Sequence, residues 1–353
     1  MKKVLLFIMA FSVLLFTGCS ENYGENTSET TSQQSEELSD ATRDFFAMDT
    51  YMNLTAYGKN ADEAVDQAQK RVEELDKLLS TGEKNSEVSL LNKNRKAKLS
   101  EETFSLTEQS LYFYKLTDKA FDPAIYPIMK LWGFTDHNYK VPDTNSIKST
   151  LKYIDASKIS IDKKTSTVIL DGEGMEVDFG GIAKGYTSSQ IIEIFKSCGI
   201  KSGKVNLGGN VHLLGKKQDG SDWSIGIQNP NSTDDFLGIL KASDTAVITS
   251  GGYERNFEEN GTVYHHIIDP STGYPANNGL TSVTIISQNG TLADALSTSL
   301  FVMGTEKAQD FWKNSKEDFE IILYTDDDKV IISKGIADKF TTSFDLTVID
   351  KVN

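Results

Sequence analysis

The chain of 353 residues predicts an α+β fold. Segments with strand-like alternation and segments with helical spacing are mixed, without the regular strand–helix–strand order of a doubly wound sheet. The balance of apolar and charged residues is that of an ordinary globular protein, and no repeat recurs at a solenoid period. The length leaves room for one large domain or two modest ones.

The first residues have the pattern of a targeting segment. Lysines at positions 2 and 3 precede an apolar run from Val4 to Phe16, which is short for a membrane span and typical of a signal peptide. The small residues directly before Cys19 resemble a bacterial lipobox; a plain secretory signal followed by a chance cysteine is the alternative. We expect a lipoprotein signal peptide over 1–18 and a mature chain anchored through lipidated Cys19 to the extracytoplasmic face of a bacterial membrane.

Residues 19–42 form the next predicted segment. They are rich in Ser, Thr, Glu, Gln and Asn, with hardly an apolar side chain, which predicts a disordered tether. The folded domain is expected over 43–353. Its second cysteine, Cys198, falls near the end of an amphipathic helix and is expected to pack in the core. The net charge of -15 argues against a nucleic-acid binder.

The first half of the domain begins with a strand after Met48. Apolar residues at helical spacing predict a core-facing helix over 61–79, and a second helix is predicted over 105–117. Two prolines and a Trp-Gly pair between 120 and 134 indicate an irregular, packed loop, and the polar residues 136–148 indicate an insertion.

A glycine-rich stretch over 177–186 follows the apolar run 167–170 and precedes a helix over 187–195. Glycines at such a strand-to-helix turn let backbone N–H groups approach a ligand, and a helix N-terminus favours an anion. Lys184 adds a positive charge, and Asp178 can accept hydrogen bonds from a sugar or base. A tight structural turn without ligand is the alternative.

The second half reads mainly as strands. Residues 204–215 predict a strand interrupted by a glycine pair, and further strands are predicted over 223–227, 246–249 and 281–287. A turn follows at 271–275, and a helix is predicted over 291–303, ended by a glycine.

Asp294 and Thr298 lie four residues apart on that predicted helix, so their oxygens point the same way. A carboxylate and a hydroxyl are hard oxygen ligands of the kind that Mg²⁺ takes. The alternative is a capping aspartate and a threonine that bonds back to its own helix.

His266 is the leading candidate for a general base, because a histidine pKa can be moved near working pH. It follows His265 in a strand-like run, so the two rings should point to opposite faces. A core histidine satisfied by hydrogen bonds is the alternative. Together with the glycine turn and the oxygen pair, His266 indicates phosphoryl or nucleotidyl chemistry outside the cytoplasm, without naming a substrate.

These motifs, in this order, resemble the ApbE family of FAD:protein FMN transferases. The matching positions run from about 46 to 304 and include 48 and 50, 80–81, 86–87, 120–122, 131–134, 177–186, 205–209, 249–253, 266–275 and 293–298. The resemblance implies a T-fold-like α+β body of mixed sheets and packed helices, with FAD in a central cleft. It implies an enzyme that, with Mg²⁺, transfers FMN from FAD through a phosphoester bond to a Ser or Thr hydroxyl of an extracytoplasmic partner, expected to be a redox protein, and releases AMP.

The resemblance also assigns site residues. Mg²⁺ would be held by Asp294, Thr298 and the backbone carbonyl of Gly181, with His266 as the general base. FAD would be contacted by Met48, Ala120, Phe121, Asp122, Asp178, Lys184, His266 and Ile267. One position departs from the family: Gly82 stands where relatives often carry an aromatic residue that packs on the flavin nucleotide.

Two other functions use the same site. With water as acceptor, the chain would be an extracytoplasmic FAD pyrophosphatase. A flavin-binding lipoprotein that captures or stores FAD would not need a catalytic Mg²⁺ site.

Overall fold

The computed structural model describes residues 39–232 and 234–351. The signal peptide over 1–18 and Cys19 lie outside the described residues. The first strand, β1 (Asp40–Ala47), begins inside the predicted tether, because Ala41 is buried and pairs with Ala56. The folded body therefore starts at least three residues before position 43. Among the described residues, no helix combines the length and apolar character that crossing a bilayer requires.

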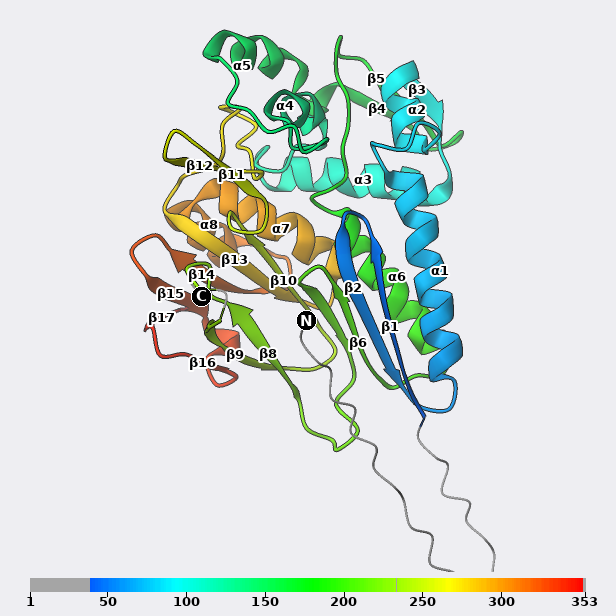
Figure 1. Cartoon of the computed structure of the whole chain (residues 1–353), viewed down its shortest axis with the longest axis vertical. Coiled ribbons are helices and arrows are strands. Elements are labelled where there is room, and N and C mark those ends of the chain that lie inside the picture. The colour runs from blue at the N-terminus through cyan, green and yellow to red at the C-terminus, as the bar shows by residue number, and fades with distance from the viewer. Residues whose placement is uncertain (1–38, 233, 352–353) are drawn as a thin grey trace, which may run out of the picture. The chain divides into compact units, whose positions relative to one another are not determined.

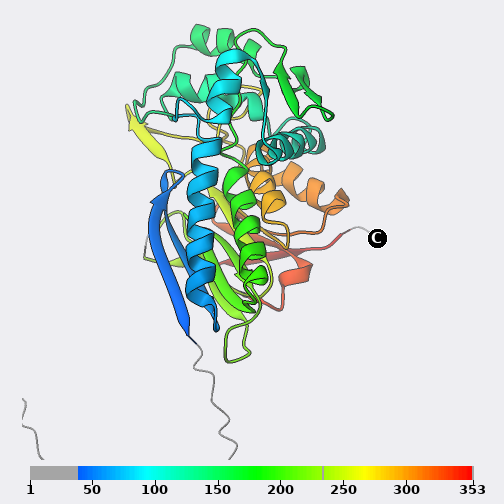
Figure 2. The ribbon, with the colours of Figure 1, turned by 90° about the vertical axis from the view of Figure 1, so that its right-hand side faces the viewer.

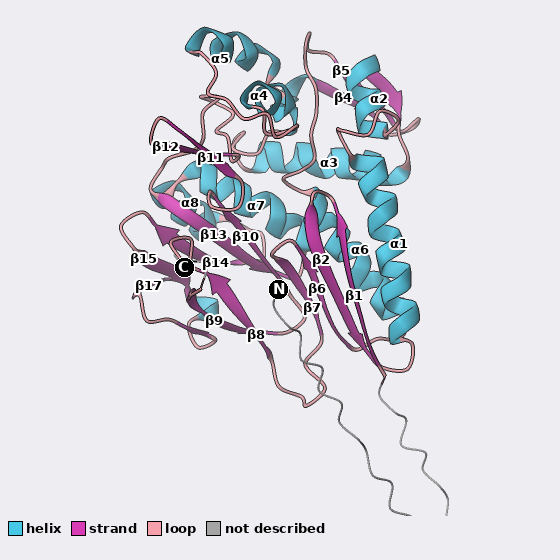
Figure 3. Ribbon diagram, in the orientation of Figure 1, coloured by secondary structure: helices cyan, strands magenta, loops and turns pink. Residues whose placement is uncertain are grey.

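A nine-stranded sheet forms the centre of the described body (Figure 3). All neighbouring strands run antiparallel except the last pair, which is parallel. In spatial order the strands are β1, β2 (Thr50–Tyr57), β6 (Ser202–Leu207), β7 (Asn210–Leu214), β10 (Ala246–Gly251), β13 (Leu280–Ser287), β14 (Glu320–Thr325), β15 (Lys329–Ser333) and β17 (Asp345–Ile349). This mixed architecture confirms the predicted α+β class.

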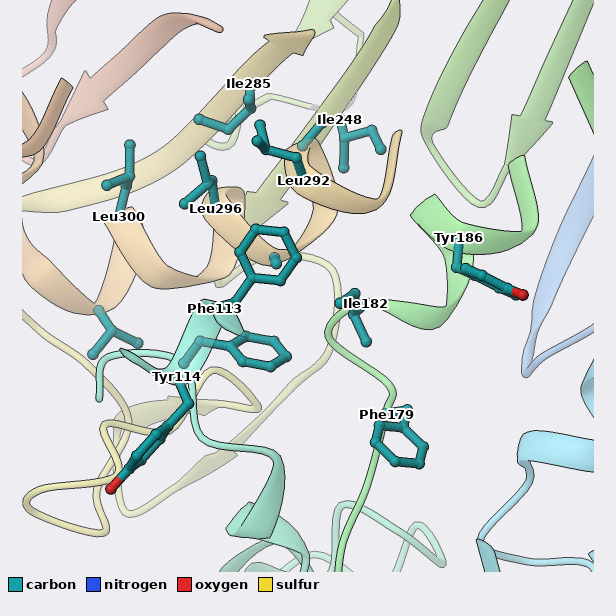
Figure 4. Packing of buried hydrophobic residues seen from close by; sticks show 14 of the residues in the cluster. Phe113, Tyr114, Phe179, Ile182, Tyr186, Ile248, Ile285, Leu292, Leu296 and Leu300 are labelled. Carbon is teal, nitrogen blue, oxygen red and sulfur yellow. The ribbon is translucent and has the colours of Figure 1, made fainter. Parts of the chain in front are cut away.

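Helices cover one face of this sheet. They are α1 (Ala61–Leu79), α6 (Ala183–Ser197), α7 (Gly290–Met303) and α8 (Thr305–Asn314). Figure 2 shows α1 and α6 side by side along the strands at one end. The bounds of α1 match the prediction, because its apolar spacing buries a single stripe of side chains: Ala61, Ala64, Val65, Ala68, Val72, Leu75 and Leu79. On α7, Leu292 and Leu296 pack toward Ile248 and Ile285 of the sheet (Figure 4).

The other face of the sheet is partly covered by a three-stranded sheet of β8 (Trp223–Gln228), β9 (Phe236–Ala242) and β16 (Phe340–Thr341). The apolar cluster between the two sheets takes residues from β7, β10, β13, β14 and β15. Within the described residues, β1 and β2 contribute none to this cluster. On their outer face, Tyr57 contacts Trp223 of β8 at one end, while Phe46 and Tyr51 are exposed at the other.

A cap of short elements lies beyond one end of the strands, in the upper part of Figure 1. It contains α2 (Glu87–Asn94), α3 (Glu101–Leu116), α4 (Tyr126–Trp132), α5 (Thr144–Thr150), a sheet of β3 (Lys96–Lys98), β5 (Thr167–Leu170) and β4 (Ile159–Asp162), and the hairpin β11 (Asn256–Glu259) and β12 (Thr262–His265). The helix predicted from Ser105 starts at Glu101, because Ser100 accepts a hydrogen bond from the Thr103 N–H and caps it. The predicted insertion contains the start of α5.

Two local predictions were wrong. The run 204–215 is not one interrupted strand: Gly208 and Gly209 both have positive φ and turn the chain, so β6 and β7 form a hairpin. The apolar run 167–170 forms β5, as predicted, but the residues that lead from it into the glycine-rich stretch do not form a strand. Instead, the Asn92 side chain bonds both the N–H and the carbonyl of Val177, at 2.7 and 2.8 Å, and so replaces a neighbouring strand.

Candidate functional site

A cavity of about 450 Å³ lies where the ends of the sheet meet the cap. The turn between β1 and β2, the glycine-rich stretch, the end of β10 and the start of α7 all contribute to its wall. The cavity brings together every residue that the sequence assigned to metal, FAD or base: Met48, Ala120, Phe121, Asp122, Asp178, Gly181, Lys184, His266, Ile267, Asp294 and Thr298. Segments far apart in the sequence therefore converge on a single site.

Asp294 is held at the bottom of this site by two donors. The Gly185 N–H donates to Oδ2 at 2.7 Å, and the buried Asn210 side chain donates to Oδ1 at 3.1 Å. Asp294 does not cap its own helix, since Asn289 does so by accepting from the Leu292 N–H. Burial raises the pKa of the carboxyl, and the nearby charge of Lys184 and these donors oppose that rise.

The N-terminus of α6 contacts an anionic group of the protein itself, where the sequence indicated an anionic ligand. No side chain of its own N-cap residue, Ile182, satisfies the first turn. The N–H of Gly185 instead donates to the carboxylate of Asp294 from α7. The expectation that this N–H would hold a phosphate oxygen is therefore revised. Lys184 and Arg255 both line the cavity and can face an anion there.

Thr298 completes a set of oxygen groups one helical turn from Asp294. Its Oγ1 lies 3.3 Å from Ser250 Oγ, which also lies 2.8 Å from Ser297 Oγ. Gly181 is close by, since a Cβ built there would lie 3.8 Å from Thr298 Oγ1. Within 39–232 and 234–351, no three His, Cys, Asp or Glu side chains are grouped to hold a metal. A carboxylate, a hydroxyl and a carbonyl fit Mg²⁺, which needs few protein ligands, and do not fit zinc.

His266 lines the cavity in its neutral form. Nδ1 lies 3.2 Å from the carbonyl oxygen of Arg255. Because a carbonyl can only accept, Nδ1 carries the hydrogen and Nε2 is left as a proton acceptor. Burial lowers the pKa of His266 to about 3 in the ligand-free protein, and the charge of Arg255 adds to this effect. His265 turns the other way, onto Phe301, as the strand-like alternation predicted.

The residues expected to contact FAD differ in how free their side chains are. Asp122 accepts from the N–H groups of Ala124 and Ala156, so its carboxylate shapes the loop, and burial raises its pKa to about 6. Asp178 accepts from the Gly180 N–H at 2.7 Å, and burial raises its pKa as well. Both carboxylates are therefore fixed by backbone donors before any ligand binds.

The loop that departs from the family also reaches the cavity. Gly82 lines the wall, and its N–H donates to Ser80 Oγ at 3.1 Å. A Cβ built on Gly82 would meet only Ser80 Oγ, at 3.6 Å, so the backbone there does not require glycine. The aromatic side chains that do line the cavity, Phe121, Phe134 and Phe179, come from other segments.

Sequence reasoning missed three polar residues of the site. Asn210 fixes Asp294, Ser250 contacts Thr298, and Arg255 lines the cavity with Nη1 at 3.8 Å from Asp49 Oδ2. A weak signal existed for Asn210, since the preceding glycine pair indicated a close approach of the backbone. Nothing in the local sequence distinguishes Arg255 from a surface arginine.

Comparisons with known proteins agree with this site. The ApbE family model matches residues 48–323. Two relatives are described as FAD:protein FMN transferases. The Klebsiella pneumoniae protein is 36% identical over 67% of this chain and 72% of its own length. The Treponema pallidum protein is 34% identical over 67% of this chain and 69% of its own length.

Solved structures extend the match to the fold. The ApbE protein of Thermotoga maritima superposes with a TM-score of 0.79 and 33% identity, covering 84% of this chain and 98% of that one. The flavin transferase ApbE of Vibrio cholerae gives a TM-score of 0.73 and 26% identity, covering 87% and 97%. With its family motifs gathered on one cavity, the chain belongs to the ApbE family.

Proposed function

We propose that this chain transfers FMN from FAD, in the presence of Mg²⁺, to a Ser or Thr hydroxyl of an extracytoplasmic partner protein. The chain is a flavin transferase of the ApbE family, as its relatives are. The observation that carries the finer proposal is the convergence of Asp294, Thr298, Lys184 and His266 on one cavity. It combines hard oxygen ligands, a cation and a neutral imidazole, which are the groups that phosphoryl transfer to a hydroxyl requires.

The residues divide the work as follows. Asp294, Thr298 and the Gly181 carbonyl would hold Mg²⁺, which supplies charge neutralisation on the phosphates of FAD. Lys184 faces the same anions. The acceptor oxygen forms a bond to the FMN phosphorus while the phosphoanhydride bond breaks, and AMP leaves with that electron pair. The hydroxyl proton passes to Nε2 of His266, whose low pKa the incoming phosphate charge would raise toward working pH.

Replacing Asp294 separates catalysis from capture of FAD. We expect Asp294→Ala to abolish turnover while weakening FAD binding far less, because the carboxylate serves the metal and not the flavin. FAD binding is measured by fluorescence quenching and turnover by AMP release, with Asp328→Ala on the surface as control. Equal loss of binding and turnover would contradict the catalytic assignment.

Replacing His266 tests the base. We expect His266→Ala to keep FAD bound and to slow transfer by at least about 100-fold, the usual contribution of a positioned general base. Asp328→Ala, on the surface and outside the cavity lining, is again the control. Transfer at the wild-type rate, at every pH tested, would remove His266 from this role.

The location is part of the proposal. The lipobox-like residues before Cys19 support anchoring of the mature chain at the outer face of the membrane. Cys19→Ser should then move the protein from the membrane fraction to the soluble fraction. The same distribution of wild type and variant between the two fractions would contradict lipid anchoring at Cys19.

A further inference from the structure

The hairpin of β1 and β2 ends in a two-residue turn, Met48-Asp49, that lines the cavity. Both residues have positive φ, as a tight turn of this kind requires. Met48 accepts from the Thr187 hydroxyl on α6, and Asp49 faces Arg255 and His137 at 3.8 and 3.6 Å. The turn is therefore anchored from both sides and forms one edge of the cavity mouth.

Phe46 and Tyr51 lie directly outside this turn and face each other across the two strands. Their exposed fractions of 69% and 62% are the largest of the bulky apolar side chains in the part of the chain that the structure describes. They point away from the helices, since Ala47 and Met52, the next residues along the strands, are buried in the opposite face. Each exposed aromatic residue thus lies about two residues along its strand from Met48 or Asp49 in the cavity lining, a distance of roughly 7 Å.

In the described part of the chain, the polar partner of this pair is Asp44, which faces the Tyr51 hydroxyl and leaves both rings uncovered. The small sheet that covers the other strands does not reach it, and neither ring packs on another aromatic ring among the described residues. Aromatic residues are over-represented where proteins bind each other, because they bury a large area at a small cost in side-chain entropy. The hydroxyl that receives FMN must enter through this mouth, so the protein that carries it must cover the neighbouring surface.

We propose that Phe46 and Tyr51 form the docking surface for the acceptor protein, where they contact an apolar side chain next to the hydroxyl that receives FMN. This inference rests on the proposed function and adds the place where the partner binds. A bilayer surface fits the pair less well, because Asp44 and Asp49 flank it and would be repelled by anionic lipid headgroups.

The test compares a protein acceptor with a small one. The protein acceptor is the extracytoplasmic protein of the same organism that gains an FMN mass with the wild-type enzyme. The small acceptor is N-acetylthreonine amide, which is too short to touch the pair while its hydroxyl is in the cavity. The double variant Phe46→Gln with Tyr51→Gln is compared with Phe236→Gln, which removes an aromatic residue that is 51% exposed on β9, outside the cavity lining.

We expect the double variant to lose at least tenfold in kcat/KM for the protein acceptor, through KM, with transfer to the small acceptor and FAD affinity retained. The conservative pair Phe46→Leu with Tyr51→Phe should recover most of the rate. Unchanged transfer to the protein, or equal loss with both acceptors, would overturn the proposal. A double variant that keeps transfer to the protein acceptor and loses only its binding to phosphatidylglycerol vesicles would also overturn it. If no extracytoplasmic protein of the organism gains an FMN mass with the wild-type enzyme, and the small acceptor gains none either, the proposed function itself has failed.

Discussion

Asp294 depends on a residue that lies far from it in the sequence. Asn210, buried at the start of β7, donates to the carboxylate oxygen that the Gly185 N–H does not occupy. Each oxygen thus has one protein donor and keeps a lone pair for a further partner. A carboxylate fixed in this way meets a metal without first reorganising, which is the usual role of a residue behind a metal ligand.

Removal of Asn210 should therefore weaken the binding of Mg²⁺ more than the binding of FAD. We expect Asn210→Ala to lower the affinity for Mg²⁺, in the presence of FAD, by about 10- to 100-fold. Titration calorimetry with Mg²⁺ measures this, and Asn231→Ala, which contacts Tyr324 and Asp328 on another surface, is the control. An unchanged Mg²⁺ affinity would mean that Asn210 only supports the fold.

The candidate site residues could be identified from the sequence more readily than the residues that support them. Asp294 and Thr298 were found because helical spacing puts them on one face, and His266 because strand alternation separates it from His265. Asn210, Ser250 and Arg255 could not be found in the same way. Their contacts join segments that are distant in the chain, and only the folded structure brings those segments together.

At the scale of elements, the site depends on how closely α6 and α7 approach each other. Gly185 on α6 faces Gly290 and Asp294 on α7, so that the start of one helix lies against the side chain of the other. A Cβ added at Gly185 would collide with the carbonyl of Gly290 and lie 2.5 Å from Asp294 Cβ. Glycine at this position therefore allows the close packing and also positions the Asp294 carboxylate.

Gly185→Ala should force the two helices apart. We expect a loss of about 1–3 kcal/mol in the free energy of unfolding, as overpacked sites show, together with weaker Mg²⁺ binding. Urea denaturation measures the first quantity. Gly82→Ala, where the added Cβ has room, is the matched control and should change stability little. If Gly185→Ala had wild-type stability, α6 and α7 would be less closely packed at Gly185 than described.

Elements with strong local signals could be predicted from the sequence, and those set by tertiary contacts could not. The helix over 61–79 follows from its apolar stripe alone. The apolar run 167–170 was also predicted correctly and forms β5. The strand does not continue to the glycine-rich stretch, where Val177 bonds the side chain of Asn92 instead of a neighbouring strand. The β6–β7 hairpin was hidden because a glycine pair marks a turn and a close approach equally well.

At the scale of the whole molecule, buried histidines make stability depend on pH. His212 lies on β7 and faces α6, with its Nδ1 3.0 Å from Ser188 Oγ. The charges of Lys196 and Glu193 also act on it. Burial lowers its pKa to about 4, from an ordinary value of 6.5. The unfolded chain therefore binds more protons than the folded one between pH 6.5 and 4, so this group costs stability as the pH falls through that range.

We expect His212→Asn to remove this acid sensitivity. Since one pKa unit corresponds to about 1.36 kcal/mol, the unfolding free energy of the variant relative to wild type should rise by roughly 3 kcal/mol from pH 7.5 to pH 4. The difference in unfolding free energy between variant and wild type must be used, because Asp122 acts in the opposite direction. Burial raises the pKa of Asp122 to about 6, so this group adds stability as the pH falls. A pH-independent difference would mean that His212 is protonated in the folded state.

The most direct test of the central claim is the mass of the acceptor protein. Full-length enzyme in detergent is mixed with FAD, Mg²⁺ and secreted redox proteins of the same organism, and intact masses are recorded with and without EDTA. The account predicts that one acceptor gains the mass of an FMN unit while AMP is released, and that EDTA prevents both. AMP and free FMN without a modified acceptor, or bound FAD that stays intact, would contradict it.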